Sequence, residues 1–308
     1  AMLWSCNKEG DVRVTCSNNL TELDCTDQSF HIDTTKSGRK VLLIGIDGFR
    51  PDGIHADIAP NLFRLANSDS SFYTNEHIVE DLTFSGPNWS SILNGVHWCK
   101  HRVQDNDYSS HELARFPHFF YYLENALDSV NTASISHWLP INEHVAAPYG
   151  DYVPMDSWND ADIFAQATDL ISNAVPLAPD VVFLQFDELD AAGHNYGFDP
   201  DIEEYAATIT TIDGYVGGLM QTIEQARAND DDWLVMVVSD HGGCDTGHSG
   251  GQDNDFINKT IFIANHPTAA FRENYISSQA DLAATILDFM GVESAAFNCK
   301  TDGISLLQ

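Results

Sequence analysis

Aspartate side chains follow three apolar segments of the chain. The segments and their aspartates are Val41–Ile46 with Asp47, Val181–Phe186 with Asp187 and Asp190, and Trp233–Val238 with Asp240. One such aspartate could be an ordinary helix cap or turn residue. Carboxylates that lie close together repel one another unless cations sit between them. We therefore interpret the aspartates of the three segments together as part of a metal site.

Histidines accompany two of these aspartates. His194 comes four residues after Asp190, so both would share one face if the segment is helical. His241 directly follows Asp240, and His248 lies seven residues further on. Mixed Asp and His ligands suit zinc or a similar first-row ion better than calcium, which prefers oxygen throughout.

A candidate nucleophile lies between Thr83 and Gly95. Gly86-Pro87 is a turn signal ahead of the helix-like stretch Trp89–Leu93, which would put Ser85 near a helix N-terminus. Backbone N–H groups and the helix dipole favour a phosphate-like anion at such a position. Taken alone, the stretch fits a plain Ser/Thr capping turn equally well.

The three apolar segments are typical of strands buried on both faces. Helical patterns lie between the segments, at 60–66, 116–127, 161–175, 202–228 and 279–290, and residues 132–135 and 261–264 are further candidate strands. This alternation predicts an α/β fold, a three-layer α/β/α sandwich with a mostly parallel central sheet. In such sheets ligands bind beyond the carboxyl ends of the strands, where the aspartates stand.

The composition excludes several classes of partner. The 308 residues include 14 Lys+Arg and 46 Asp+Glu, which gives a formal charge of −32. Such a surface argues against binding nucleic acid or anionic lipid. A hydrophobic content of 43% can still supply a core. No apolar run approaches the roughly 18 residues that a membrane span requires.

Six cysteines, at 6, 16, 25, 99, 244 and 299, favour disulfides and an oxidising compartment. We expect a secreted or periplasmic protein whose targeting peptide has been removed. The start, Ala1–Trp4, does not show the basic segment followed by an apolar stretch that is typical of a targeting peptide. A composition shift at 36–40 predicts a polar, Cys-rich N-terminal extension over 1–38, packed on a single catalytic domain over 39–308. The disulfide pairing and the oligomeric state stay open.

Four motifs in order resemble the signature of the nucleotide pyrophosphatase/phosphodiesterase family, within the alkaline phosphatase superfamily. They are Ile46–Asp52, Ser85-x-Pro87-Asn88 with Gly95 downstream, Asp190-x-x-Gly193-His194 and Ser239–Gly242. The resemblance spans about residues 40–307. It implies an alkaline-phosphatase-like core and a hydrolase of small-molecule phosphate esters, chiefly a phosphodiesterase or pyrophosphatase.

The resemblance also implies two divalent metal ions, which in that family are zinc. The first set of ligands would be Asp47, Ser85, Asp240 and His241, and the second Asp190, His194 and His248. Ser85 would be the nucleophile and form a phosphoseryl intermediate, with Thr83 in reserve. Asn106 would contact a phosphoryl oxygen.

Departures from the family pattern leave alternatives. His248 follows His241 closely where larger relatives have a long insertion, so His266 is the alternative ligand. Gly86 stands where nucleotide-specific members have an aromatic residue, so nucleotide specificity is not expected. Trp89 replaces the Arg of the sulfatase motif. A phosphomonoesterase or phosphonate hydrolase, and a non-catalytic acidic secreted metal-binding protein, are the competing interpretations.

Overall fold

A six-stranded sheet forms the centre of the molecule. The computed structural model describes residues 38–172, 177–250, 253–292 and 301–308. The strand order is β2-β6-β5-β1-β4-β3. The strands are β1 (Arg39–Ile46), β2 (Ser71–Ile78), β3 (Thr132–Ser136), β4 (Val181–Phe186), β5 (Asp232–Val238) and β6 (Lys259–Asn265).

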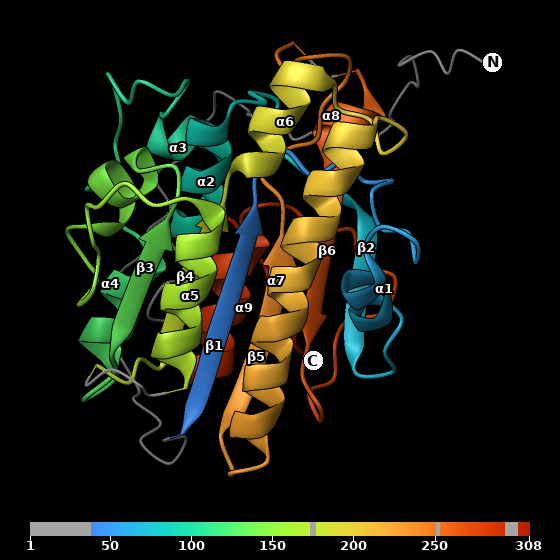
Figure 1. The fold of residues 1–308 in the computed structure, drawn as a ribbon. Helices are drawn as coiled ribbons and strands as arrows, with labels where there is room; N and C mark the ends of the chain where they lie inside the picture. The colour runs from blue at the N-terminus through green and yellow to red at the C-terminus, as the bar shows by residue number, and fades with distance from the viewer. Residues whose placement is uncertain (1–37, 173–176, 251–252, 293–300) are drawn as a thin grey trace.

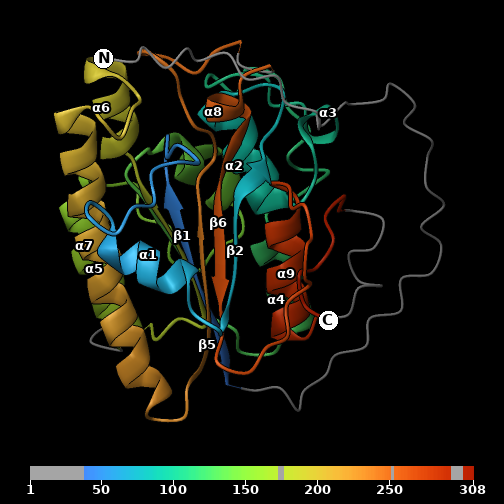
Figure 2. The ribbon, with the colours of Figure 1, turned by 90° about the vertical axis from the view of Figure 1, so that its right-hand side faces the viewer.

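The strands β3, β4, β1 and β5 run parallel, and β6 runs antiparallel to both β5 and β2. Figure 2 shows the arrowheads of β1 and β6 pointing to opposite ends of the sheet. Gly45 lies opposite both Gln185 and Val238 in the register. The carboxyl ends of β1, β4 and β5 are therefore level, and the predicted mostly parallel sheet is confirmed.

Helices cover both faces of the sheet. They are α1 (Pro60–Ala66), α2 (Ser85–Asn94), α3 (Trp98–His101), α4 (Phe119–Ala126), α5 (Asp160–Ile171), α6 (Glu188–Tyr196), α7 (Glu203–Arg227), α8 (Asp255–Asn258) and α9 (Asp281–Met290), with a π-helical turn over Asn142–Ala146. Figure 2 shows α5 and α7 on one side of the sheet and α4 and α9 on the other. The α6 helix lies at the end of the sheet to which β1 and β3 point (Figure 1).

Alternate side chains of the central strands enter two apolar clusters. Leu43 and Phe183 belong to the cluster beneath α4 and α9, whereas Leu42 and Leu184 belong to the cluster beneath α5 and α7. Because both faces are buried, each central strand is apolar at nearly every position. This is the physical reason for the continuous apolar segments in the sequence.

The five predicted helices correspond to α1, α4, α5, α7 and α9, although residues 173–176 lie outside the described residues. The N-terminal extension and four of the six cysteines lie outside them too. The packing of the N-terminal extension on the core, the domain boundary at residue 38 and the disulfides therefore stay predictions. Among the described helices, none combines the length and apolar character of a membrane span.

Candidate active site

The predicted aspartates and histidines converge at the carboxyl edge of the sheet. Asp47 follows β1 and Asp240 and His241 follow β5, and the three offer ligand atoms within 4.8 Å of one another. Ser85 is the first residue of α2, as expected near a helix N-terminus. Its Oγ lies 3.3 Å from Nε2 of His241 and 3.5 Å from Oδ1 of Asp47. The hydroxyl of Ser85 is therefore buried next to the candidate metal ligands Asp47 and His241.

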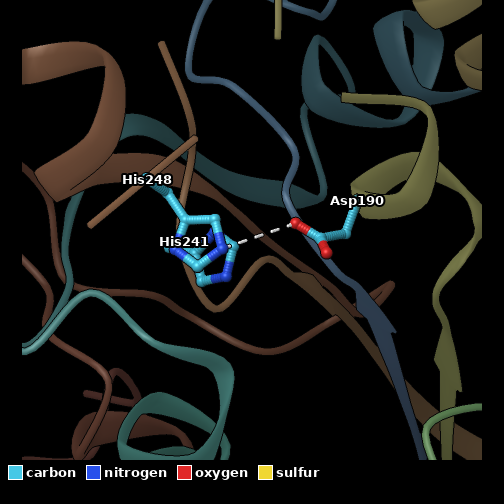
Figure 3. Close-up of side chains that lie close together, drawn as sticks. All are labelled: Asp190, His241 and His248. Atoms are coloured by element: carbon cyan, nitrogen blue, oxygen red, sulfur yellow. Dashed lines mark ion pairs between the residues drawn. The ribbon is translucent and has the colours of Figure 1, made fainter. Parts of the chain in front are cut away.

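A second group lies beside the first and comprises Asp190, His241 and His248, drawn in Figure 3. The dashed line marks the contact of 3.9 Å between Asp190 Oδ1 and His248 Nε2. The segment carrying Asp190 is helical, so the condition for a shared face is met and His194 lies on the same face of α6. Its Nε2 is 3.4 Å from Asp190 Oδ2 and 3.1 Å from His248 Nε2.

The three histidines are oriented alike. Each donates its Nδ1–H to a backbone carbonyl, with His194 bonded to Thr246, His241 to Gly242 and His248 to Thr83. Such bonds fix the tautomer in which Nε2 carries the lone pair. All three Nε2 atoms then face the aspartates as acceptors, which is the arrangement of metal ligands.

The carboxylates show the complementary feature. Oδ1 of Asp190 and Oδ2 of Asp240 are buried and have no hydrogen-bond partner among the residues that the structure describes. Burial, together with the charges of Asp47 and Asp187, raises the pKa of Asp190 to about 9. Burial, followed by the charge of a neighbouring aspartate, also raises the pKa of Asp47 and of Asp240. Uncompensated buried carboxylates are costly, and divalent cations would remove that cost. The donor set therefore fits divalent metal ions.

Two of the histidines, His241 and His248, are held in the neutral form by burial. Burial, reinforced by the charge of His194, lowers the pKa of His248 to about 4. Burial, followed by the charges of His248 and His194, lowers the pKa of His241. Metal ligation requires neutral imidazole, so these shifts favour the ligand role.

Thr83, the alternative nucleophile, and His266, the alternative metal ligand, do not occupy the positions that those roles require. The Thr83 hydroxyl donates to the backbone oxygen of His248, and the Thr83 carbonyl accepts from His248 Nδ1. Thr83 thus holds the histidine in position. His266 Nε2 bonds Asp232 Oδ1 at 2.6 Å, at the amino end of β5 and so at the opposite edge of the sheet. The structure therefore brings His248, and not His266, to Asp190.

Asn106 lies beside the candidate nucleophile. Its Oδ1 accepts a hydrogen bond of 2.8 Å from the backbone N–H of Gly86, the residue after Ser85. The side chain is exposed, and its Nδ2 makes no hydrogen bond within the described residues. The amide N–H₂ is thus available to a bound anion.

Two further residues were missed as part of the site. Trp89 Nε1 and Gln185 Nε2 both donate to Oδ2 of Asp47, at 2.8 and 3.2 Å. Gln185 also donates to Oδ1 of Asp187 at 3.0 Å. The one residue in the sequence that could have indicated the position of Trp89 is Gly45, because a Cβ at Gly45 would collide with the Trp89 ring.

Comparisons with known proteins agree with this geometry. The sequence pattern of the type I phosphodiesterase/nucleotide pyrophosphatase family matches residues 41–120 and 121–281. A comparison with curated proteins by sequence gave no match.

Solved structures share the fold. Murine ectonucleotide pyrophosphatase/phosphodiesterase 5, in an inactive form in complex with AMP, superposes with a TM-score of 0.63 at 14% identity, over 88% of this chain and 100% of that one. The human protein of that name gives 0.62 at 16% identity, over the same shares. A candidate sulfatase from Bacteroides thetaiotaomicron gives 0.69 at 14% identity, over 87% of this chain and 74% of that one.

The family match covers most of the chain and includes Asp47, Ser85, Asp190 and Asp240. The fold and the convergence of these side chains at one edge agree with it. The chain is therefore a phosphoric ester hydrolase that belongs to the type I phosphodiesterase/nucleotide pyrophosphatase family.

Proposed function

We propose that the protein hydrolyses small-molecule phosphodiesters or pyrophosphates through a phosphoseryl intermediate on Ser85, at a site for two zinc ions. The observation that carries the proposal is the position of Ser85 Oγ, 3.3 Å from His241 Nε2 and 3.5 Å from Asp47 Oδ1. A serine hydroxyl held between candidate metal ligands is suited to attack phosphorus without a neighbouring general base.

The ligands of the two ions follow the family assignment. They would be Asp47, Ser85, Asp240 and His241 for one ion, and Asp190, His194 and His248 for the other. The contacts of 3.1 to 3.4 Å that join His194 to His248 and Asp190 support the second set. When bound, two zinc ions would lower the pKa of the Ser85 hydroxyl and balance the charge that develops on the phosphoryl group.

The protein's own residues orient the substrate and carry the reaction through two steps. Ser85 Oγ attacks phosphorus, the new O–P bond forms, and the bond to the leaving alkoxide or phosphate breaks. Asn106, bonded through Oδ1 to Gly86, presents its amide N–H₂ to a phosphoryl oxygen. Attack of water on the phosphoserine then releases phosphate or a monoester and restores Ser85.

The loop around Gly86 bears on substrate choice. A Cβ at this position would collide with the backbone oxygen of Asp105, so no larger side chain fits. An aromatic residue that could stack on a nucleobase is thus excluded at this point of the site. This favours simple phosphodiesters over nucleotides.

Two measurements test the proposal together. Wild-type protein supplied with Zn²⁺ should hydrolyse bis-p-nitrophenyl phosphate faster than p-nitrophenyl phosphate. Ser85→Ala should lose at least about 100-fold in rate while keeping its bound metal. Ser109→Ala, at an exposed serine, is the matched control and should keep full activity.

The alternatives predict other results. A faster reaction with the monoester would favour a phosphomonoesterase, and selective cleavage of a phosphonate would favour a phosphonate hydrolase. No turnover by wild-type protein that retains its metal would favour a non-catalytic metal-binding protein. Unchanged activity in Ser85→Ala would contradict the role of Ser85.

We further propose an extracytoplasmic location, because three of the six cysteines fall within the first 25 residues. Protein purified without reductant and then denatured should react with fewer than six equivalents of a thiol reagent. Six reactive thiols would contradict the proposal.

A further inference from the structure

A third group of potential metal ligands lies outside the candidate active site. It consists of His137, Asp160 and Glu188, whose ligand atoms all lie within 4.8 Å of one another. His137 directly follows β3, Asp160 begins α5 and Glu188 begins α6. The group shares no residue with the two groups described above. It therefore joins three elements that are distant in sequence.

Asp160 accepts hydrogen bonds on both of its carboxyl oxygens. It is fully buried, yet Oδ1 accepts from the backbone N–H of Asp187 at 2.9 Å and from His137 Nδ1 at 2.7 Å. Oδ2 accepts from the backbone N–H of Glu188 at 3.1 Å. Each oxygen has two lone pairs, so Oδ2 retains one for a cation.

Glu188 adds a carboxylate that has no partner. Within the described residues its side chain makes no hydrogen bond or ion pair, although it lies within reach of both His137 and Asp160. Asp187 contributes another partly buried carboxyl close by, bonded to Gln185. No Lys or Arg of the described residues pairs with any of these three acids. The basic side chains near them are His137 and, for Asp187, also His194.

We propose that His137, Asp160 and Glu188 bind a third divalent transition-metal ion, such as Zn²⁺ or Mn²⁺, with water completing its coordination. One imidazole nitrogen and two carboxylates are ligands that suit these ions. The ion would fasten the end of β3 and the first turns of α5 and α6 to one another. Because α6 carries Asp190 and His194, the ion would stabilise the helix that supplies ligands to the active site.

Metal stoichiometry tests the proposal. Each protein is dialysed to equilibrium against Mn²⁺, then against Zn²⁺ in a second series, and bound metal is measured by plasma mass spectrometry. Glu188→Gln should bind about one equivalent per chain fewer than wild type. His137→Asn, which removes another ligand, should show the same loss. Glu203→Gln, in the exposed first turn of α7, is the control and should bind as wild type does.

A further variant separates this proposal from the proposed function. Asp190→Asn should lose metal from the active site and still lose about one further equivalent when Glu188→Gln is added. Equal metal content in wild type, Glu188→Gln and His137→Asn would overturn the third site, with a proton on His137 then supplying the balancing charge. That result would leave the activity of Ser85 untouched, so the two proposals fail independently.

Discussion

The indole N–H of Trp89 donates a hydrogen bond of 2.8 Å to Oδ2 of Asp47, and both side chains are fully buried. The bond fixes the orientation of a carboxylate whose other oxygen faces Ser85. Trp89 stands in the motif position where sulfatases have an arginine. The indole thus gives this chain a way to orient Asp47 without adding a positive charge.

Replacement of Trp89 by Phe should weaken metal binding or activity. The phenyl ring would fill most of the space of the indole, but Oδ2 of Asp47 would lose one of its two hydrogen-bond donors. Hydrogen-bond partners of metal ligands typically contribute 10- to 100-fold to affinity or activity, so a loss of about that size is expected. Zinc titration and the rate with bis-p-nitrophenyl phosphate measure the two effects.

Trp233→Phe is the matched control for this change. Trp233 is also buried, but in the described part of the chain its Nε1 has no hydrogen-bond partner. Its replacement should leave metal affinity and rate close to wild type. Equal losses in the two variants would mean that ring volume, and not the bond to Asp47, matters.

Gly45→Ala should destabilise the fold and disturb the site. A Cβ at Gly45 would lie 2.8 Å from Cζ3 of Trp89 and would press the ring away from Asp47. Overpacking of this kind costs about 1–3 kcal/mol of the free energy of unfolding. Denaturant unfolding measures the cost, and the rate with the diester should fall as well.

Gly214→Ala provides the contrast. Gly214 lies in α7, and a Cβ there would meet no atom within 4 Å. Because Ala is a better helix former than Gly, this variant should gain about 1 kcal/mol. A gain or no change in Gly45→Ala would refute the predicted collision.

Acid should destabilise the protein through His77. Burial lowers the pKa of His77 to about 4, while the imidazole bonds Ser277 and Gln279. The unfolded chain therefore binds more protons than the folded chain between this pKa and that of free histidine. Stability falls as the pH decreases through that window, and His77 contributes about 2 kcal/mol of the loss between pH 7.5 and 5.

Urea unfolding of wild type and His77→Gln at the two pH values measures this contribution. The variant should lose less stability on acidification than wild type does. His55→Gln, at an exposed histidine, should behave as wild type. An identical pH dependence in wild type and His77→Gln would contradict the buried neutral state of His77.

The central strands could be predicted because burial on both faces leaves an apolar segment in the sequence. Their register was not needed to expect Asp47, Asp187 and Asp240 at one edge, since parallel strands deliver their carboxyl ends together. The four ordered motifs then indicated the family. These parts of the fold and site follow from local pattern alone.

Other elements left no such pattern. The strand β2 contains exposed polar residues because it lies at the edge of the sheet, so it resembles a loop in sequence. The α6 helix is short and carries Asp190 and His194 where an amphipathic helix would show a longer apolar stripe. Its helical form was only a condition of the ligand hypothesis.

Contacts between distant segments could not be predicted. Trp89 reaches Asp47 across 42 positions, and Gln185 reaches it across 138. Whether His248 or His266 joins Asp190 depended on the path of the turn after β5, which the spacing of histidines does not determine. The group at His137 likewise depends on how three elements pack together.

The most direct test of the central claim is to trap the phosphorylated enzyme. Protein turning over bis-p-nitrophenyl phosphate is quenched with acid within milliseconds, digested and sequenced by tandem mass spectrometry. One p-nitrophenolate leaves on attack, so the proposed mechanism predicts a p-nitrophenylphosphoryl group on Ser85, absent from Ser85→Ala. The same group on Thr83 instead, or turnover with no covalently modified residue at any quench time, would contradict it.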